Sequence, residues 1–371
     1  MRWLFLLLMI AVFLSVNLYV FLRAWQAIGL NNMIWKIAFI AIAVLLSVSM
    51  FVFFMISESV PISVSGFLYR FSTTWFIAFI YFFLFILLRD IILVVDRYTH
   101  FIPVSISANP KFYQLSFYVT TGIAVVILLI GFINYNSKKR VELTIDTGKM
   151  KESVKMVMVS DLHLGYAIGT GEVDKWVKLI NKENPDIVLI AGDLIDNSVR
   201  PLNELNFDLH LKNINAPLGV YACPGNHEFI SNIQRSAEFM KKSNINFLVD
   251  TTVLINNSFY LIGRNDKTDP NRKTIDELAA GLDRSKPVVL LDHQPYNLEE
   301  TSKNKIDLQL SGHTHKGQVW PITWIINAMY EVPYGFKKKE DTNIYVSSGL
   351  GIWGGKFRIG SSSEYAVIYL K

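Results

Sequence analysis

Five short polar segments in the second half of this 371-residue chain carry side chains that could ligate metal ions. Each segment follows a run of β-forming apolar residues, and five of the seven histidines lie in these segments. The side chains concerned belong to Asp161, His163, Asp193, Asn226, His227, His293, His313 and His315. Because ligands of α/β sheets bind beyond the carboxyl ends of the strands, we expect the five segments to converge on one place.

Seven of these side chains are candidate metal ligands: two carboxylates, one amide oxygen and four imidazoles. They belong to Asp161, Asp193, Asn226, His163, His293, His313 and His315. This number of mixed oxygen and nitrogen donors suits two divalent ions of the Mn, Fe, Zn, Co or Ni type, whereas a single tetrahedral zinc would leave three donors unused. We therefore predict a centre with two divalent metal ions, whose identity the residues leave open.

Two adjacent divalent ions suit the hydrolysis of a phosphate ester, because they generate hydroxide and neutralise the phosphoryl oxygens. A leaving alkoxide also needs a proton donor, and His227, next to Asn226, is placed for that role. Asp196, three residues after Asp193, is predicted to orient the imidazole of His227. The predicted catalytic residues are therefore His227 and Asp196.

The chain contains a second copy of its first triplet, because Asp208-Leu209-His210 repeats Asp161-Leu162-His163. The repeat follows no β-forming run, and its leucines have helical spacing. We predict that Asp208 and His210 are surface or helix-packing residues.

From residue 141 onwards, short β-rich runs alternate with amphipathic charged segments, which is typical of a mixed α/β domain. The predicted strands cover residues 155–160, 186–191, 219–222, 259–263, 287–291, 307–310 and 344–347. The predicted helices cover residues 172–183 and 233–243. Each polar segment described above comes directly after one of these strands.

The two parts of the chain differ in composition and charge. Residues 1–140 hold ten Lys or Arg and three Asp or Glu, a net charge of +7. The remaining 231 residues hold 26 Lys or Arg and 28 Asp or Glu, a net charge of −2. We predict a transmembrane region in residues 1–140 and a soluble domain in residues 141–371. The negative balance of the second part argues against a nucleic-acid partner, since binding to a phosphate backbone requires a basic face.

Four stretches of the first part are apolar over about the 20 residues that a membrane-spanning helix needs. They cover residues 3–22, 37–56, 73–95 and 115–135. The first lacks a small-x-small cleavage site, so we interpret it as an uncleaved helix rather than a signal peptide. The lipid bilayer is thus a predicted partner, and the protein is predicted to be a multi-pass integral membrane protein.

The basic residues at the ends of these stretches divide evenly, five on each side of the membrane. The densest cluster, Lys138-Lys139-Arg140, follows the last stretch and favours a cytoplasmic location for the second part.

Taken in order, the polar segments resemble those of the calcineurin-like metallophosphoesterase superfamily. The motifs are Asp161-Leu-His163, Gly192-Asp193-Leu-Ile-Asp196, Gly225-Asn226-His227-Glu228, His293 and Gly312-His313-Thr-His315. The continuation Lys316-Gly317-Gln318 and the ending through Arg358 are similar to the bacterial membrane-associated branch. The arginine that follows the second aspartate in protein-phosphatase members is replaced by Asn197, which argues against that activity.

This resemblance implies a four-layer α-β-β-α sandwich with a binuclear metal centre in a bacterial cytoplasmic (inner) membrane protein. One metal would be held by Asp161, His163, Asp193 and His315. The other would be held by Asp193, Asn226, His293 and His313, with Asp193 bridging the two. His227 and Asp196 would form the acid pair.

The segment 320–330 is unusually apolar for a loop beside a polar site. It either completes the core or forms an apolar wall that admits a lipid tail. Together with four spans, the second interpretation predicts a phosphorylated lipid substrate. The resemblance to the bacterial membrane-associated branch implies, as an example, a substrate of the UDP-diacylglucosamine type. Candidate contacts to the substrate phosphate are Arg264, Lys316, Lys356 and above all Arg358, although solvated surface charge is the alternative for each.

The sequence therefore predicts a membrane-anchored hydrolase that cleaves a phosphomonoester, phosphodiester or pyrophosphate bond with metal-bound hydroxide. Its substrate would be a phosphorylated small molecule or lipid. The alternative is a membrane sensor or transporter whose phosphoesterase-like domain binds a ligand without turnover. Loss of metal ligands would favour that alternative, but all seven are present.

Overall fold

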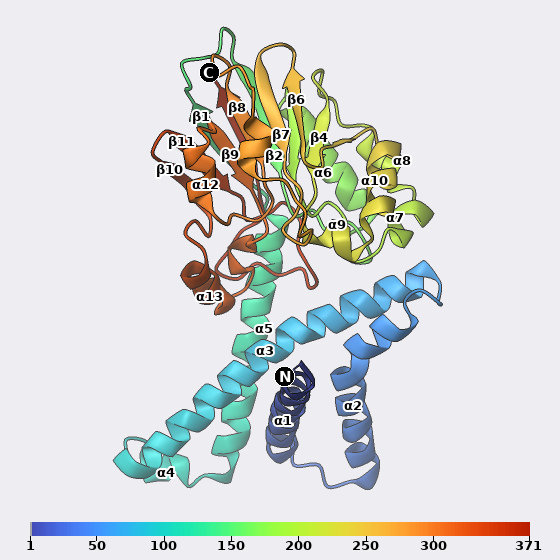
Figure 1. Cartoon of the computed structure of the whole chain (residues 1–371). Coiled ribbons are helices and arrows are strands. Elements are labelled where there is room, and N and C mark those ends of the chain that lie inside the picture. The colour runs from blue at the N-terminus through green and yellow to red at the C-terminus, as the bar shows by residue number, and fades with distance from the viewer. Residues whose placement is uncertain (1) are drawn as a thin grey trace. The chain divides into compact units, whose positions relative to one another are not determined.

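The computed structural model describes residues 2–371 and divides into two compact units that meet between Ile130 and Gly131 (Figure 1). The predicted boundary at residue 140 lies ten residues later. The difference arises because the last turns of the final apolar helix pack into the C-terminal unit. The carbonyl of Gly131 accepts a hydrogen bond from the Arg358 amide at 2.9 Å, and Tyr135 is fully buried.

The N-terminal unit is helical. Its helices are α1 (Arg2–Ile28), α2 (Met33–Ile56), α3 (Ile62–Thr99), α4 (Val104–Ser107) and α5 (Pro110–Asn136), of which α5 continues into the second unit. Within the described part of the chain, four of these helices are long and apolar enough to cross a membrane. The prediction of four spans is thereby confirmed.

Helix α3 extends beyond the predicted stretch 73–95 in both directions, to 38 residues. Its first turns contain serines and an arginine, which lower the local hydropathy. Ser65 remains compatible with the helix because its hydroxyl donates to the carbonyl of Ser57 at 2.7 Å. Hydropathy alone underestimated this helix because a polar side chain with a local hydrogen bond does not end a helix.

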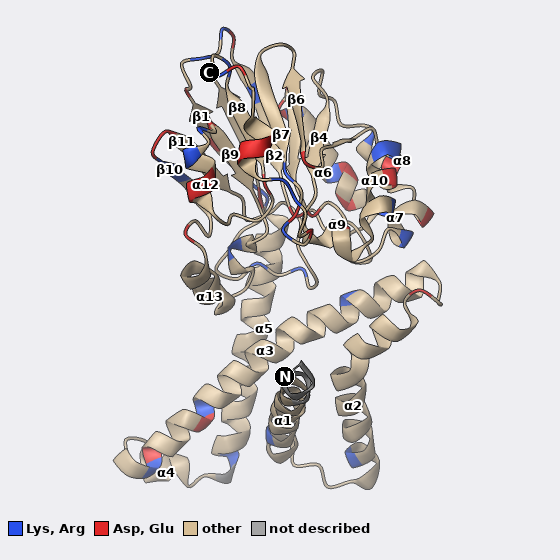
Figure 2. Cartoon of the chain, viewed as in Figure 1, with Lys and Arg blue, Asp and Glu red and all other residues tan. Residues whose placement is uncertain are grey.

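The charged residues of the N-terminal unit gather at helix ends (Figure 2). The end of α1, the start of α2, the end of α3 and the start of α5 carry most of them, and the helix middles are almost free of charge. This distribution is the one expected of helices whose middles lie in hydrocarbon.

The C-terminal unit contains two mixed sheets. The first has the strand order β1-β12-β2-β3-β4-β5, in which β2, β3, β4 and β5 run parallel and β12 is antiparallel to β2. Its strands are β1 (Lys139–Ile145), β2 (Val154–Val159), β3 (Ile187–Ala191), β4 (Val220–Cys223), β5 (Asn246–Phe247) and β12 (Glu364–Leu370). Strand β1 was not predicted, because Lys139 and Arg140 at its start were interpreted as part of the basic cluster that follows the last span.

The second sheet has the order β10-β11-β9-β8-β7-β6, with β7, β8, β9 and β11 parallel. Its strands are β6 (Thr251–Ile255), β7 (Phe259–Gly263), β8 (Val288–Leu291), β9 (Leu308–Ser311), β10 (Gly335–Lys339) and β11 (Thr342–Val346). The seven predicted strands coincide with β2, β3, β4, β7, β8, β9 and β11 to within two residues.

The two sheets pack face to face over a shared apolar core. Met156 and Leu189 of the first sheet and Leu261 and Val289 of the second are all fully buried in it. The opposite faces are covered by helices: Leu278 of α11, for example, packs on Leu290 of β8. Figure 1 shows α6, α8 and α10 beside the first sheet and α12 beside the second, so the predicted four-layer α-β-β-α sandwich is confirmed.

Short helices connect the strands of this unit. They are α6 (Thr170–Lys182), α7 (Arg200–Glu204), α8 (Phe207–Leu211), α9 (Asn226–Ile230), α10 (Ile233–Lys242), α11 (Ile275–Ala279), α12 (Leu298–Lys303), the 3₁₀ turn His315–Gly317 and α13 (Ile322–Met329). The predicted helices 172–183 and 233–243 correspond to α6 and α10. The repeated triplet lies on α8, where Asp208 pairs with Lys212 and Lys242, and His210 pairs with Asp174.

Candidate metal centre

The five polar segments all begin where a parallel strand ends, and strands of both sheets contribute. The carboxyl end of β2 leads to Asp161 and His163, β3 to Asp193 and Asp196, β4 to Asn226 and His227, β8 to His293, and β9 to His313 and His315. Because the two sheets pack face to face, these ends meet at one edge of the sandwich. The structure thus brings all nine predicted metal-ligating and catalytic residues together.

The imidazoles and carboxylates form two outer groups, around His315 and around His293, and a third group of His163, Asp193 and His227 lies between them. In one group, His315 Nε2 lies 3.1 Å from His163 Nε2 and 3.4 Å from Asp161 Oδ1. Asp193 Oδ2 lies 3.8 Å from His163 Nε2 and 3.0 Å from His293 Nε2. Asp193 therefore lies next to side chains of both outer groups.

The second group is completed by His313 and Asn226. The donor atoms of Asp193, His293 and His313 all lie within 4.8 Å of one another. His313 Nδ1 lies 2.9 Å from Asn226 Oδ1. Oxygen and nitrogen donors of seven predicted ligands thus lie close together at this edge of the sandwich.

Hydrogen bonds to the protein backbone orient several of these side chains. His293 Nδ1 lies 2.7 Å from the carbonyl of Ala191, so this nitrogen donates to the backbone and Nε2 is the atom that faces Asp193. The amide of His313 donates to Asp161 Oδ1 at 2.9 Å, and the amide of His227 donates to Asp193 Oδ1 at 3.0 Å. Each loop therefore fixes a side chain that another loop contributes.

Close packing of the loops explains two of the motif glycines. A Cβ at Gly225 would collide with the carboxylate of Asp193, and one at Gly192 would lie within 2.7 Å of three atoms of the His293 side chain. Gly192 also has φ +80°, which glycine adopts without strain. Asp161, His163 and Asp193 adopt positive φ as well, as is common for strained residues at functional sites.

Burial and neighbouring charges set the protonation of the imidazoles. Burial, with the charge of His293, lowers the pKa of His313 to about 3. Burial, with the charge of His163, holds the pKa of His315 well below its usual value. Both rings are therefore neutral at neutral pH, which is the form that ligates a metal.

The two carboxylates of the centre are fully buried. Burial raises the pKa of Asp161, and the negative charge of Asp193 adds to this shift. The pKa of Asp193 remains depressed despite its burial, because His293 lies beside it. Two buried carboxylates in one small site call for a compensating positive charge. Together with the neutral imidazoles, this donor set fits divalent cations.

His227 and Asp196 form a pair next to the metal ligands. His227 Nδ1 lies 3.4 Å from Asp196 Oδ1 and 3.1 Å from the Asp196 carbonyl. Burial lowers the pKa of His227, but the hydrogen bond to Asp196 and the charge of Asp193 outweigh burial and raise the pKa to about 9. The imidazole is thus protonated at neutral pH, and its side chain is 12% exposed, so it can donate a proton at the site.

Glu228 has a structural role that the sequence analysis did not identify. Its carboxylate is fully buried and accepts hydrogen bonds from the amides of Gly225, Asp193 and Ile195, at 2.7, 3.0 and 3.0 Å. It thereby joins the loop after β3 to the loop after β4. Its position directly after Asn226-His227 was the available signal, because an acidic residue at the third position of a helix often accepts backbone amides.

Arg358 does not face the site as the predicted substrate contact would require. Its side chain is fully buried, and its guanidinium donates to the carbonyls of His315, Gly349 and Gly351 at 2.9, 3.3 and 2.8 Å. The sequence cannot distinguish a buried arginine in a loop from an exposed one. In the structure Arg358 positions the loop that carries His315.

The other three basic residues considered as phosphate contacts also have protein partners. Arg264 is buried and pairs with Asp292 and Glu300, and Lys356 pairs with Glu172. The ammonium of Lys316 lies 4.5 Å from the ring centre of Tyr334. Interactions within the protein therefore account for these charges.

The apolar segment 320–330 contains the helix α13, which has an exposed apolar face. Trp324, Ile325 and Met329 are 65%, 57% and 61% exposed. The segment ends at Tyr330, whose buried ring lies edge-on to His313 with the ring centres 6.1 Å apart. The segment thus joins the second metal-ligand group to an apolar surface, which carries no charged residue (Figure 2).

Comparison with known proteins identifies the family. The family model described as calcineurin-like phosphoesterase matches residues 154–317. A metallophosphoesterase of Campylobacter jejuni is 30% identical over 267 residues, 70% of each chain. One of Aquifex aeolicus is 32% identical over 237 residues, 62% of this chain and 90% of the relative. The chain belongs to the calcineurin-like phosphoesterase family and is a hydrolase of phosphate esters.

Relatives also combine this domain with membrane segments. A protein of Danio rerio that is named transmembrane protein with metallophosphoesterase domain is 31% identical over 276 residues, 67% of this chain and 61% of the relative. In the present chain the metallophosphoesterase domain follows four helices that could each span a membrane. The chain is accordingly a membrane-associated metallophosphoesterase.

Proposed function

We propose that this protein is a membrane-anchored phosphoesterase with two divalent metal ions that hydrolyses a phosphorylated lipid. The observation that carries the lipid assignment is the exposed apolar face of α13, which Tyr330 connects to the ligand His313. A soluble substrate gives no reason to keep two large apolar side chains and a tryptophan exposed next to a polar site. An acyl chain lying along α13 would bury them.

The metal ligands of the proposal are those that the structure brings into the two groups. Asp161, His163, Asp193 and His315 would hold one ion, and Asp193, Asn226, His293 and His313 the other. When bound, the ions supply Lewis acidity, which lowers the pKa of water and offsets the charge of the phosphoryl oxygens.

The chain's own contribution to bond cleavage is proton transfer by His227. The imidazolium donates a proton to the oxygen that leaves phosphorus, so an alcohol departs neutral instead of as an alkoxide, and a phosphate departs with one negative charge fewer. Asp196 holds the ring in place and stabilises its charged form. Neither residue needs to bind a metal for this role.

The experiment measures two substrates with the full-length, manganese-loaded protein in non-ionic detergent. One is soluble bis-p-nitrophenyl phosphate, and the other is a panel of phosphatidic acid, phosphatidylglycerol and UDP-diacylglucosamine. The variant is the pair W324S/M329S, and Leu254→Ser, an exposed leucine on the edge strand β6, is the matched control. Asp193→Asn provides the inactive blank.

We expect W324S/M329S to lower kcat/KM for the cleaved lipid about tenfold while leaving the soluble ester unaffected, because only the lipid uses the apolar face. Leu254→Ser should change neither rate. Hydrolysis of the soluble ester without cleavage of any lipid in the panel, or an equal loss on both substrates in W324S/M329S, would overturn the lipid assignment.

We further propose a bacterial cytoplasmic membrane as the location, with the catalytic unit in the cytoplasm. The support is the cluster Lys138-Lys139-Arg140 after the last span and the bacterial relatives. The test uses Ser258→Cys in the exposed turn between β6 and β7, since the native Cys223 is buried. A membrane-impermeant maleimide should label this cysteine only after the cells are lysed, and labelling of intact spheroplasts would place the unit outside.

A further inference from the structure

The N-terminal unit contains a cavity of about 740 Å³ between α1, the C-terminal part of α3 and the segment that leads into α5. Three arginines line it, Arg23 of α1 and Arg89 and Arg97 of α3, with His100 just beyond α3. Its volume is typical of a site for a small ligand, which measures ~300–1,000 Å³. Charged walls are unusual in a unit whose helices are otherwise apolar, and polar groups at such places are usually functional.

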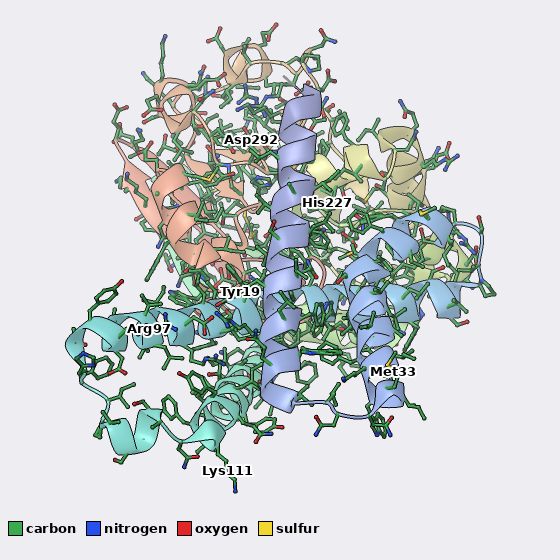
Figure 3. The ribbon with its side chains drawn as sticks, turned by 90° about the horizontal axis from the view of Figure 1, so that it is seen from below. Tyr19, Met33, Arg97, Lys111, His227 and Asp292 are labelled. Carbon is green, nitrogen blue, oxygen red and sulfur yellow. The ribbon has the colours of Figure 1, made fainter. Side chains whose placement is uncertain are left out.

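Two of the arginines share one carboxylate. Arg23 Nε lies 2.6 Å from Asp90 Oδ2, and a guanidinium nitrogen of Arg89 lies 3.1 Å from Asp90 Oδ1. Tyr19 also donates its hydroxyl to Asp90 Oδ2 at 2.7 Å, and Figure 3 shows Tyr19 on α1 beside α3. Asp90 is therefore saturated with donors, and this side of the cavity keeps an excess of positive charge.

The remaining charges of the wall, Asp96 and Arg97, leave this excess at one positive charge. Asp96 is occupied by the amide of Ile102, which donates to Oδ1 at 2.7 Å. Arg97 is exposed and has neither a hydrogen bond nor an ion pair within residues 2–371, and the buried Nε of Arg89 has no hydrogen-bond partner there either. The guanidinium of Arg97 and the Nε of Arg89 are thus available to donate hydrogen bonds to a ligand in the cavity.

The cavity lies towards one end of the unit rather than at the middle of its long helices. It lies at the end of the unit where α1 and α3 finish and α2 and α5 begin. Trp25, Trp35, Tyr98 and Tyr113 lie at this same end, and aromatic residues of these two types concentrate at membrane–water interfaces.

We propose that this cavity binds the phosphate group of an anionic ligand at the membrane interface. Arginine recognises phosphate oxygens through paired, charge-assisted hydrogen bonds. Leu93 and Val94 line the same cavity, so a phospholipid would also find an apolar wall for its glycerol and acyl carbons, whereas free phosphate would use the arginines alone. The proposal does not rest on the proposed function, because every residue in it belongs to the N-terminal unit.

The experiment is native mass spectrometry of the full-length, metal-loaded protein in non-ionic detergent, with either dioctanoyl phosphatidylglycerol or inorganic phosphate added. Arg97→Gln is the informative variant, because the loss of an arginine without a protein partner leaves the fold unchanged. Lys111→Gln removes the same charge at the same end of the unit but outside the cavity wall, and Figure 3 shows Lys111 well apart from Arg97.

We expect the wild type to retain one bound ligand, and Arg97→Gln to weaken its binding about tenfold, as loss of one charge-assisted hydrogen bond predicts. Lys111→Gln and Asp193→Asn should bind as the wild type does, the latter because the metal centre is a different site. Retention of phosphatidylglycerol alone identifies a lipid headgroup as the ligand, and retention of inorganic phosphate identifies the free anion.

Two results would overturn the proposal. One is that neither ligand is retained by the wild type. The other is that Lys111→Gln weakens binding as much as Arg97→Gln, which would mean general attraction to a basic surface. Hydrolysis of bis-p-nitrophenyl phosphate should be the same in Arg97→Gln as in the wild type, so failure here leaves the proposed function untouched.

Discussion

The protonation state of His227 is the most informative property of a single residue in this site. Its imidazole is charged at neutral pH because Asp196 and Asp193 lie beside it, whereas the nearby rings of His313 and His315 are neutral. The pKa of the predicted ligand His293 is also raised, by the neighbouring Asp193, so the acid role of His227 rests on its pairing with Asp196 together with its pKa. In the sequence all four residues are simply histidine, so their protonation states cannot be distinguished there.

The first prediction concerns His227→Ala. We expect kcat to fall by ~10²–10⁴-fold, the usual contribution of a general acid, with the bound metal retained. Metal content by elemental analysis and hydrolysis of an alkyl phosphate ester, whose alkoxide needs a proton in order to leave, are measured on the same sample. His210→Ala, which removes a histidine paired with Asp174 on α8, should leave both values unchanged. Loss of the metal in His227→Ala would instead make His227 a ligand.

The second prediction concerns the pH dependence of kcat. The acid form of His227 is required, so kcat should decline as the pH rises through the pKa, which the structure places at about 9. In Asp196→Asn the carboxylate that raises this pKa is lost, and the decline should move towards the ordinary histidine value of 6.5. An alkaline limb that stays in place would show that Asp196 does not act on His227.

At the scale of elements, loops tie the carboxyl ends of two sheets together, and residues that touch no substrate hold them. Glu228 joins the loops after β3 and β4 through three backbone amides, and Arg358 joins the carbonyl of His315 to those of Gly349 and Gly351. The backbone of Arg358 also bonds to Gly131 and Asn134 of α5. The last apolar helix is thus connected through one residue to a metal ligand.

The third prediction is that Arg358→Lys weakens metal binding by ~10–100-fold, the usual effect of losing an outer partner of a ligand. Lysine keeps the positive charge but cannot span three carbonyls, so the effect reports positioning rather than charge. The dissociation constant for Mn²⁺ of the full-length protein is the measurement. Arg235→Lys, an exposed position on α10, is the control and should bind as tightly as the wild type.

At the scale of the whole molecule, two units with separate cores are joined in one chain. Among the described residues, no carboxylate of the N-terminal unit is fully buried, whereas the C-terminal unit buries Asp161 and Asp193 together. Buried like charges destabilise a fold unless a cation offsets them, so the stability of the second unit should depend on bound metal.

The fourth prediction follows from this difference. Removal of metal with EDTA should lower the thermal midpoint of the C-terminal unit by several degrees. The midpoint of the helical N-terminal unit should not change, because the predicted metal ligands all belong to the C-terminal unit. Hydrogen–deuterium exchange, read by mass spectrometry on peptides of each unit at rising temperature, gives a separate signal for each unit. Equal shifts in both signals, or none after the metal is shown to be gone, would contradict the prediction.

The sequence by itself determined the chemistry and the class of fold. Residue types at strand ends are local facts, and the order Asp161, Asp193, Asn226, His293 and His313 after β-forming runs suffices to predict one site. Four apolar stretches likewise predicted four spans, because a helix that crosses the hydrocarbon of a bilayer must be apolar along its length, and that composition is visible in a local stretch of sequence.

The tertiary structure decided what depends on distance between remote segments. The burial of Arg358, the role of Glu228 and the exposure of α13 cannot be read from letters, because each follows from what packs against the residue. The arginine cavity is the same kind of case. Arg23 and Asp90 are 67 positions apart in the chain, and only the packing of α1 on α3 brings their opposite charges into contact.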